Sequence, residues 1–312
     1  MGLSKEFKTY NEQLEILRDR GLIINDVSRV TRILEKENYY NIINGYKDLY
    51  LNPAASEEQY KTGVNFLEIY SLYEFDRNIR HIFLKQILKI ENNLKSAISY
   101  DFSQQYDSDN YLTLSNFELG SDKKLEAVSQ LIASIQNDIA RNICKNLSIK
   151  HYMEIYGYIP FWVLVNILTF GTISKFYGLM KLSDRQKVAS RYNISEKSLR
   201  SYIKLIALFR NICAHEERFY NFKASSRDIS YNALHSHLNI QKINGRYIYG
   251  LNDVFALLIT VKVLCAKSDF QVLFQSLSKE IDTLSNKQNS IIVQDILKEM
   301  GFPNNWKDIN QY

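Results

Sequence analysis

Apolar side chains recur at every third or fourth position over long stretches of this chain, as they do along one face of an α-helix. The longest stretch follows Gly63, and neither glycine nor proline interrupts the sequence between Val64 and Leu119. The apolar positions on this face are Leu72, Ile79, Phe83, Ile87, Ile90, Leu94 and Ile98. We therefore predict a helix from about Asn65 to Ser103, which is long for a globular protein.

Two more helical stretches follow this one. An amphipathic stretch begins after Ser121, whose hydroxyl suits the capping position at a helix N-terminus. An apolar run then opens after Pro160, a residue that is tolerated in the first turn of a helix. This run predicts a helix over Phe161 to Phe170 that bends at Gly171 and resumes through Met180.

The two ends of the chain show weaker patterns. The first sixty residues predict three short helices, which are separated at Gly21 and near Asn38 and end at a polar loop from Asn52 to Gln59. Near the other end, Asn244-Gly245 between short apolar-rich runs is typical of a type I′ β-hairpin. The helices expected beyond this hairpin lie near Asn252 to Lys267, Asp269 to Leu284 and Ile291 to Glu299.

These patterns predict an all-α fold with one small hairpin, divided at the polar loop and after the central helices. An N-terminal helical segment covers residues 1–58, a helical core covers residues 59–222, and a C-terminal extension covers residues 223–312. Only three prolines and eleven glycines occur in 312 residues, which agrees with long helices. The 46% hydrophobic content is enough to fill a core.

Cysteine content and hydropathy indicate the cellular compartment in which the protein is expected. Cys144, Cys213 and Cys265 form no close pair, so we expect no disulfide and no structural zinc or other metal. The polar N-terminus lacks the apolar stretch of a signal peptide. The most apolar runs, residues 161–170 and 254–266, are shorter than the roughly 20 residues that a membrane span requires. We therefore expect a cytoplasmic protein without a membrane partner.

Charge and motifs narrow the function further. The formal net charge of +5 is compatible with a polyanionic partner, although by itself it is weak evidence. The 22 tyrosines and 16 phenylalanines include candidates for stacking on unpaired bases, while most phenylalanines are expected in the core. The sequence has no glycine-rich phosphate loop, no His-Glu-x-x-His and no Gly-x-Ser-x-Gly. The functions of an NTPase, a zinc protease and a serine hydrolase therefore have no support. We also expect no small-molecule cofactor.

One predicted helix carries the most informative group of residues. It runs from about Glu196, after a Ser195 cap, through Glu217. It includes Arg210-Asn-Ile-Cys-Ala-His215. Its apolar stripe, which is expected to face the core, consists of Tyr202, Ile206, Phe209 and Cys213.

Arg210 and His215 lie off that stripe and do not point in the same direction. Residues five apart are separated by about 140° at 3.6 residues per turn. The arginine must therefore bend along its stem, or a second copy of the chain must supply it across a dimer interface. Asn211 is four residues before His215 and shares its face.

Arginine and histidine are sufficient to cleave RNA without a metal, because the adjacent 2′-hydroxyl is the nucleophile. Histidine can transfer protons near neutral pH, and arginine can hold the scissile phosphate and its developing charge. Taken alone, an arginine five residues before a histidine is more typical of a surface arginine and a structural histidine near a helix end.

Other charged residues are candidates for supporting roles. Arg77 and Arg80 in the long helix form a charged face that either supports the site or is paired structurally. Lys85 and Lys89 lie on the polar side of the same helix and could line an RNA groove, or could belong to a solvated face.

Several ordered blocks resemble a known family. The stretch Phe209-Arg-Asn-Ile-Cys-Ala-His-Glu-Glu-Arg-Phe-Tyr-Asn221 resembles the signature of the Abi family of bacterial abortive-infection proteins, of the AbiD/AbiF type. The other matching blocks are Arg20-Gly-Leu-Ile-Ile24, Asn38-Tyr-Tyr-Asn-Ile-Ile-Asn-Gly-Tyr46, Tyr73-Glu-Phe-Asp-Arg-Asn-Ile-Arg80, Pro160-Phe-Trp162 and Phe170-Gly-Thr-Ile-Ser174. The resemblance covers about Leu14 to Asn221. Directly after the motif histidine, many relatives have His-Gly, whereas this chain has Glu216-Glu217.

This resemblance implies a HEPN-like helical bundle whose Arg-x4-His motif forms a metal-independent endoribonuclease site at a homodimer interface. In such a site we expect Arg210 to bind phosphate, His215 to carry out acid-base catalysis, and Asn211 to orient the histidine or the substrate. Arg218 and Asn221 would support the phosphate or the local fold. It also implies antiviral defence, RNA as substrate, and a small noncoding RNA as a bound or regulating partner. The alternatives are a non-catalytic RNA-binding module and a protein-interaction subunit of a defence or toxin-antitoxin system.

Overall fold

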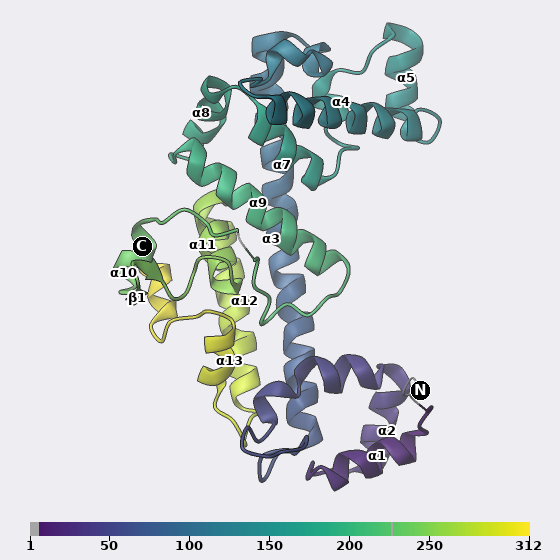
Figure 1. The fold of residues 1–312 in the computed structure, drawn as a ribbon, viewed down its shortest axis with the longest axis vertical. Coiled ribbons are helices and arrows are strands. Elements are labelled where there is room, and N and C mark those ends of the chain that lie inside the picture. Colours follow the sequence, from purple (N-terminus) through teal and green to yellow (C-terminus); the bar gives the residue numbers. More distant parts are fainter. Residues whose placement is uncertain (1–5, 226) are drawn as a thin grey trace.

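A single long helix organises the computed structural model, which describes residues 6–225 and 227–312. This helix, α3, spans Phe66–Tyr106 and runs along most of the molecule (Figure 1). The N-terminal helices gather at one of its ends, and α4 and α5 lie at the other (Figure 1). The helices α9, α11 and α12 pack against α3 in between.

The sequence sets the start of α3. The Asn65 side chain accepts a hydrogen bond from the Leu67 amide, and the Glu68 side chain bonds back to the Asn65 amide. This reciprocal capping fixes the first turn. The helix is 41 residues long and ends three residues beyond the predicted Ser103, before Asp107 with φ of 64°.

The remaining elements are mostly short helices. Those before α3 are α1 (Tyr10–Asp19), α2 (Val27–Lys36), the π-helical turn η1 (Tyr40–Asn44) and the 3-10 turn η2 (Asp48–Tyr50). Those between α3 and the motif helix are η3 (Asn110–Leu112), η4 (Leu114–Asn116), α4 (Asp122–Asn142), α5 (Leu147–Tyr156), α6 (Phe161–Leu164), α7 (Phe170–Leu179) and α8 (Leu182–Ser190). The last part of the chain contains α9 (Glu196–Ala214), α10 (Ala233–His237), α11 (Val254–Leu264), α12 (Lys267–Ser285), α13 (Val293–Glu299) and η5 (Trp306–Gln311).

The bend expected at Gly171 lies earlier in the chain. The helix that opens after Pro160 ends at Leu164, and α7 begins again at Phe170 with Gly171 inside its first turn. The cause is Thr169, whose hydroxyl accepts a hydrogen bond from the Thr172 amide and caps a new helix. The expectation at Gly171 was therefore wrong, because a capping residue started the second helix.

The hairpin prediction is confirmed. Strands β1 (Lys242–Ile243) and β2 (Arg246–Tyr247) pair antiparallel, with Ile243 opposite Arg246. Asn244 and Gly245 both have positive φ, as a type I′ turn requires. The fold is therefore all-α with one small two-stranded sheet, as the sequence predicted.

One hydrophobic core joins the three predicted segments. The helix α11 is buried along nearly its whole length and packs against both α3 and α9, while α12 lies along α3. The C-terminal extension thus contributes to the support of the motif helix. Among the described residues, no helix combines the length and the apolar character needed to cross a bilayer.

Candidate functional site

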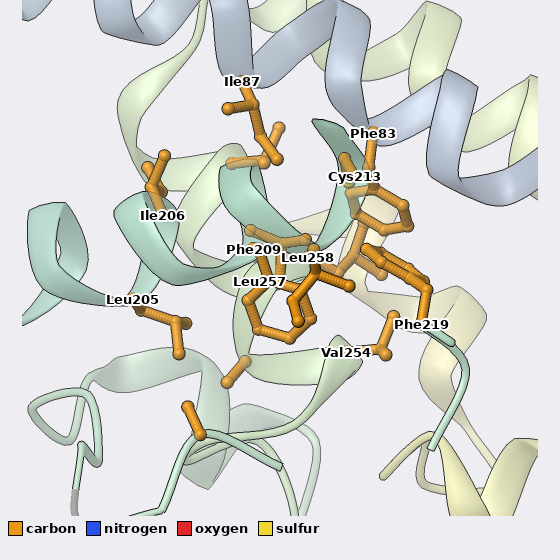
Figure 2. Close-up of a cluster of buried hydrophobic side chains, with 14 of the residues drawn as sticks. Phe83, Ile87, Leu205, Ile206, Phe209, Cys213, Phe219, Val254, Leu257 and Leu258 are labelled. Carbon is orange, nitrogen blue, oxygen red and sulfur yellow. The ribbon is translucent and has the colours of Figure 1, made fainter. Parts of the chain in front are cut away.

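The motif helix α9 is held on its apolar side by two other helices. Phe209 and Cys213 of α9 lie with Phe83 from α3 and with Leu257 and its neighbours from α11 in one buried cluster (Figure 2). The predicted stripe of Tyr202, Ile206, Phe209 and Cys213 is buried, with no more than 6% of any of these residues exposed. The opposite side of α9 is consequently left for polar residues.

The helix ends one residue before the histidine. The last helical residue is Ala214, so the expected continuation to Glu217 was wrong. The Glu217 amide donates to the Ile212 carbonyl, and Glu216 has φ of 53°. This geometry is the Schellman ending of a helix, in which the residue after the cap adopts the left-handed conformation. His215 is the capping residue itself, and its side chain is exposed.

A buried carboxylate from α3 fixes the segment after the histidine. Asp76 is fully buried and accepts hydrogen bonds from the backbone amides of Phe219 (3.1 Å) and Tyr220 (2.6 Å). The Tyr46 hydroxyl also donates to it, at 2.7 Å. Burial raises the pKa of Asp76, and these donors oppose that rise. Asp76 therefore connects the end of the motif to α3 and to the N-terminal segment.

Arg80 completes this connection from the next turn of α3. Its Nη1 atom donates to the backbone carbonyls of Glu217 (2.7 Å) and Glu216 (3.2 Å), and lies 3.1 Å from Asp76. Because Arg80 is buried and its guanidinium is engaged in this way, it acts on the site by positioning the backbone beside His215.

Arg77 and Arg218 make contacts with the N-terminal segment. Arg77 forms a two-pronged pair with the Glu37 carboxylate, at 2.8 and 2.9 Å. Arg218 donates to the Gly45 carbonyl at 2.5 Å and lies 3.8 Å from the Asp48 carboxylate. Both arginines thus link regions that are distant in the sequence, and this is the kind of geometry expected of a structural pairing.

Arg210 turns toward α3. Its Nε atom lies 3.6 Å from Oε2 of Glu91, while the other oxygen of that carboxylate is 2.8 Å from the Lys95 ammonium. Neither Nε of Arg210 nor Oε2 of Glu91 forms a hydrogen bond within the described chain. The Arg210 side chain is 36% exposed, so it is partly accessible to a ligand.

Asn211 and His215 are both exposed, and the His215 amide donates to the Asn211 carbonyl at 2.9 Å. Between them, burial raises the pKa of the Cys213 thiol to about 12, which keeps this thiol protonated. Asn221 is half-buried and follows the segment that Asp76 holds. The structure thus keeps Arg210, Asn211 and His215 within the last turn of α9 and its cap.

The two lysines predicted from α3 differ in their surroundings. Both lysines are exposed, but Lys89 also pairs with Asp269 of α12, at 2.6 Å. Sequence reasoning missed a different basic region, a groove along α9 that includes Asn211 among its lining residues. Its charges come from separate stretches of the chain, so no local motif marks them.

Comparison with known protein families identifies a match to this chain. Residues 32–221, which make up more than half of the chain, match the family described as Abi-like protein. No curated protein and no solved structure was found to match the chain. The family match ends at Asn221, directly after the segment from Glu216 to Tyr220 that Asp76 and Arg80 hold in place. The chain therefore belongs to the Abi-like protein family.

Proposed function

We propose that this protein is an antiviral abortive-infection effector, a HEPN-like endoribonuclease that cleaves RNA without a metal and works as a homodimer in the cytoplasm. Its membership of the Abi-like protein family supports a role in abortive-infection defence. The observation that carries the nuclease proposal is the exposed Asn211 and His215 pair on a rigidly held helix end, with Arg210 beside it. A small noncoding RNA is the proposed bound partner.

The chemistry needs one proton acceptor, one proton donor and a cation. A histidine imidazole removes the proton from a ribose 2′-hydroxyl, and the 2′-oxygen attacks the adjacent phosphorus. The bond from phosphorus to the 5′-oxygen breaks, and a protonated imidazole donates a proton to that oxygen. The products are a 2′,3′-cyclic phosphate and a 5′-hydroxyl end. Arg210 neutralises the phosphate as its charge grows.

A dimer supplies what one protomer lacks. Within one site, the imidazole of His215 acts first as the base and then, once protonated, as the acid. Arg210 is directed toward Glu91 of its own α3, while His215 caps the helix five residues later. Two exposed helix ends that meet would place the arginine of one protomer near the histidine of the other. Asn211 would orient the histidine or the substrate, while Arg218 and Asn221 maintain the local fold.

Substitution of the motif residues tests this function. The variants His215→Ala and Arg210→Ala should each lose RNA cleavage in vitro and growth inhibition in cells. A matched control is His151→Ala, which removes another exposed histidine, on α5. Cleavage that persists after both motif residues are changed would show that the catalytic assignment is wrong.

A non-catalytic RNA-binding function is the second candidate. It is favoured by the placement of Arg210, whose guanidinium is occupied in part by Glu91 in the single chain. In that case the Arg210→Ala and His215→Ala variants would keep both RNA affinity and growth inhibition, and purified protein would leave RNA intact.

A further inference from the structure

The exposed side of α9 forms one wall of a large groove. Helices α4 and α7 and residues 227–231 form the other walls, and the groove has a volume of about 1310 Å³. This volume exceeds the roughly 300–1,000 Å³ of pockets for drug-sized molecules. The lining part of α9 runs from Lys197 to Asn211, which is about 21 Å of helix at 1.5 Å per residue.

The charges along this groove are nearly all positive. The basic lining residues are Lys175, Lys197, Arg200, Lys204 and Arg227. In the part of the chain that the structure describes, none of these five forms an ion pair with a carboxylate. The one acidic lining residue, Asp228, is held by Arg246 through two hydrogen bonds of 2.7 and 2.9 Å.

Uncompensated positive charge affects the groove itself. Burial lowers the pKa of the Lys204 ammonium, and the nearby charges of Arg200 and Arg227 lower it further. A bound polyanion would relieve this repulsion between the cations. Five cations from three separate segments thus face a space whose one carboxylate, that of Asp228, is already paired with Arg246.

The groove also offers surfaces for bases. Tyr231 is 52% exposed at the segment that closes the groove, and the partly exposed Leu208 supplies apolar lining. Aromatic and apolar side chains stack on the faces of bases, and these faces are accessible only in an unpaired strand. The combination of a cationic track with such surfaces is typical of single-stranded nucleic-acid binding.

The groove leads to the motif. Asn211 is its lining residue nearest the C-terminal end of α9, and His215 follows one helical turn later. We infer that this groove binds a single-stranded segment of RNA through its phosphates and leads it to His215. This inference rests on the proposed function, because it assigns the substrate path of that same site.

The direct test measures RNA binding by variants that lack two groove charges. The double variant Lys175→Gln/Lys204→Gln removes one positive charge from each of two groove walls, α7 and α9. Its matched control, Lys279→Gln/Lys298→Gln, removes two exposed lysines of α12 and α13 that do not line the groove. Each double variant also carries the substitution His215→Ala, which prevents cleavage of the RNA probe. The probe is a fluorescein-labelled single-stranded oligouridine of about 15 nucleotides, followed by anisotropy at several KCl concentrations.

The groove variant should bind roughly tenfold or more weakly near 0.1 M salt. The slope of log affinity against log salt should become shallower by about 1.4, because each phosphate contact on a single strand contributes about 0.7. The control should behave as the parent. Equal affinity and slope in both double variants would overturn the inference. Displacement of the probe by uridine monophosphate at equal molar concentration would also overturn it, since the groove would then accept a single nucleotide.

A second measurement needs no change in the groove. Oligouridine that contains 4-thiouridine is photocrosslinked to the His215→Ala protein, and the attached peptides are identified by mass spectrometry. Crosslinks are expected within α9 or at Tyr231. Crosslinks confined to segments that do not line the groove would overturn the inference, even if the double variant fails to fold.

The failure of the groove and the failure of the proposed nuclease give different results. If the groove variant retains full RNA affinity while His215→Ala abolishes cleavage, the groove assignment is wrong and the nuclease stands. If groove substitutions weaken binding while His215→Ala cleaves as the unsubstituted protein does, the groove stands and the catalytic assignment is wrong.

Discussion

At the scale of single residues, Arg210 is poorly placed for a structural role. Its Nε atom is 3.6 Å from Glu91, and its side chain is 36% exposed, whereas Glu91 binds Lys95 at 2.8 Å in a nearly buried pair. At 3.6 Å, the buried Nε of Arg210 and Oε2 of Glu91 are too far apart to form a hydrogen bond, so this contact contributes little to stability. The surroundings of Arg210 are therefore consistent with an arginine kept for a ligand.

The long Arg210–Glu91 contact and the short Glu91–Lys95 pair predict different stabilities for variants at these two positions. Arg210→Ala should lower the free energy of unfolding by less than about 1 kcal/mol, because the contact it removes is 3.6 Å long and forms no hydrogen bond. Glu91→Gln should cost about 2 to 3 kcal/mol, because it leaves the Lys95 ammonium buried without a counter-charge. Urea denaturation measures both. Equal losses would mean that Arg210 is a structural cross-link.

Asp253 predicts a dependence of stability on pH. Burial raises the pKa of this carboxyl from 3.8 to about 6. Between these two values the folded protein binds more protons than the unfolded chain, so stability falls as the pH rises through this window. The loss attributable to Asp253 is about 3 kcal/mol between pH 4 and pH 7.

The variant Asp253→Asn isolates this effect, since other buried carboxyls are common to both proteins. The unfolding free energy of the unsubstituted protein, relative to that of the variant, should decrease as the pH rises from about 4 to about 7. A constant difference across this range would show that the folded-state pKa of Asp253 is not raised.

Sequence could single out the residues of the motif but not their contacts. Arg210, Asn211 and His215 stood out because their types and spacing match a chemistry and a family pattern. The roles of Asp76 and Arg80 depend on side chains that reach backbone groups more than 130 positions away. Such contacts depend on tertiary packing, which local periodicity does not encode.

At the scale of elements, the cap of α9 is strained at one position. Glu216 occupies the left-handed place in the Schellman ending, where glycine is favoured. Its negative charge also lies at the negative end of the helix dipole. Both effects disfavour glutamate at this position.

Glu216→Gly should therefore raise the free energy of unfolding by about 1 kcal/mol. It should also strengthen RNA binding, because it removes a carboxylate beside the proposed phosphate site. Thermal denaturation and the anisotropy assay provide the two readouts. Glu217→Gly is the control, since it removes the same charge outside the left-handed position. A Glu216→Gly protein less stable than its parent would contradict this account of the cap.

Helices with strong caps and long periodicity were predicted well. The helices α3 and α9 begin at the expected residues because Asn65 and Ser195 supply capping side chains. The short helices α5, α8 and α10 were not predicted, because so few turns show little periodicity. The helices α1 and α2 are equally short, but the break at Gly21 separates them in the sequence.

At the scale of the whole molecule, the fold leaves the end of α9 open. The helix is supported by α3 and α11 on its apolar side, while the N-terminal segment reaches the motif through Tyr46 and Gly45. Asn211 and His215 are exposed, and no neighbour within residues 6–225 and 227–312 covers them. The basic groove could not be foreseen, because α7, α9 and residues 227–231 meet only in the folded chain.

The central claim is a site shared between two protomers, and mixing two inactive variants tests it most directly. Arg210→Ala lacks the phosphate-binding residue and His215→Ala lacks the imidazole, so each homodimer should be inactive. When equal amounts of the two variants exchange subunits at random, half of the dimers contain one subunit of each. Each of these mixed dimers has one of its two sites intact. RNA cleavage should therefore recover to about a quarter of that of the unsubstituted protein. A mixture that exchanges subunits, yet stays as inactive as its components while the unsubstituted protein cleaves RNA, would contradict the shared site.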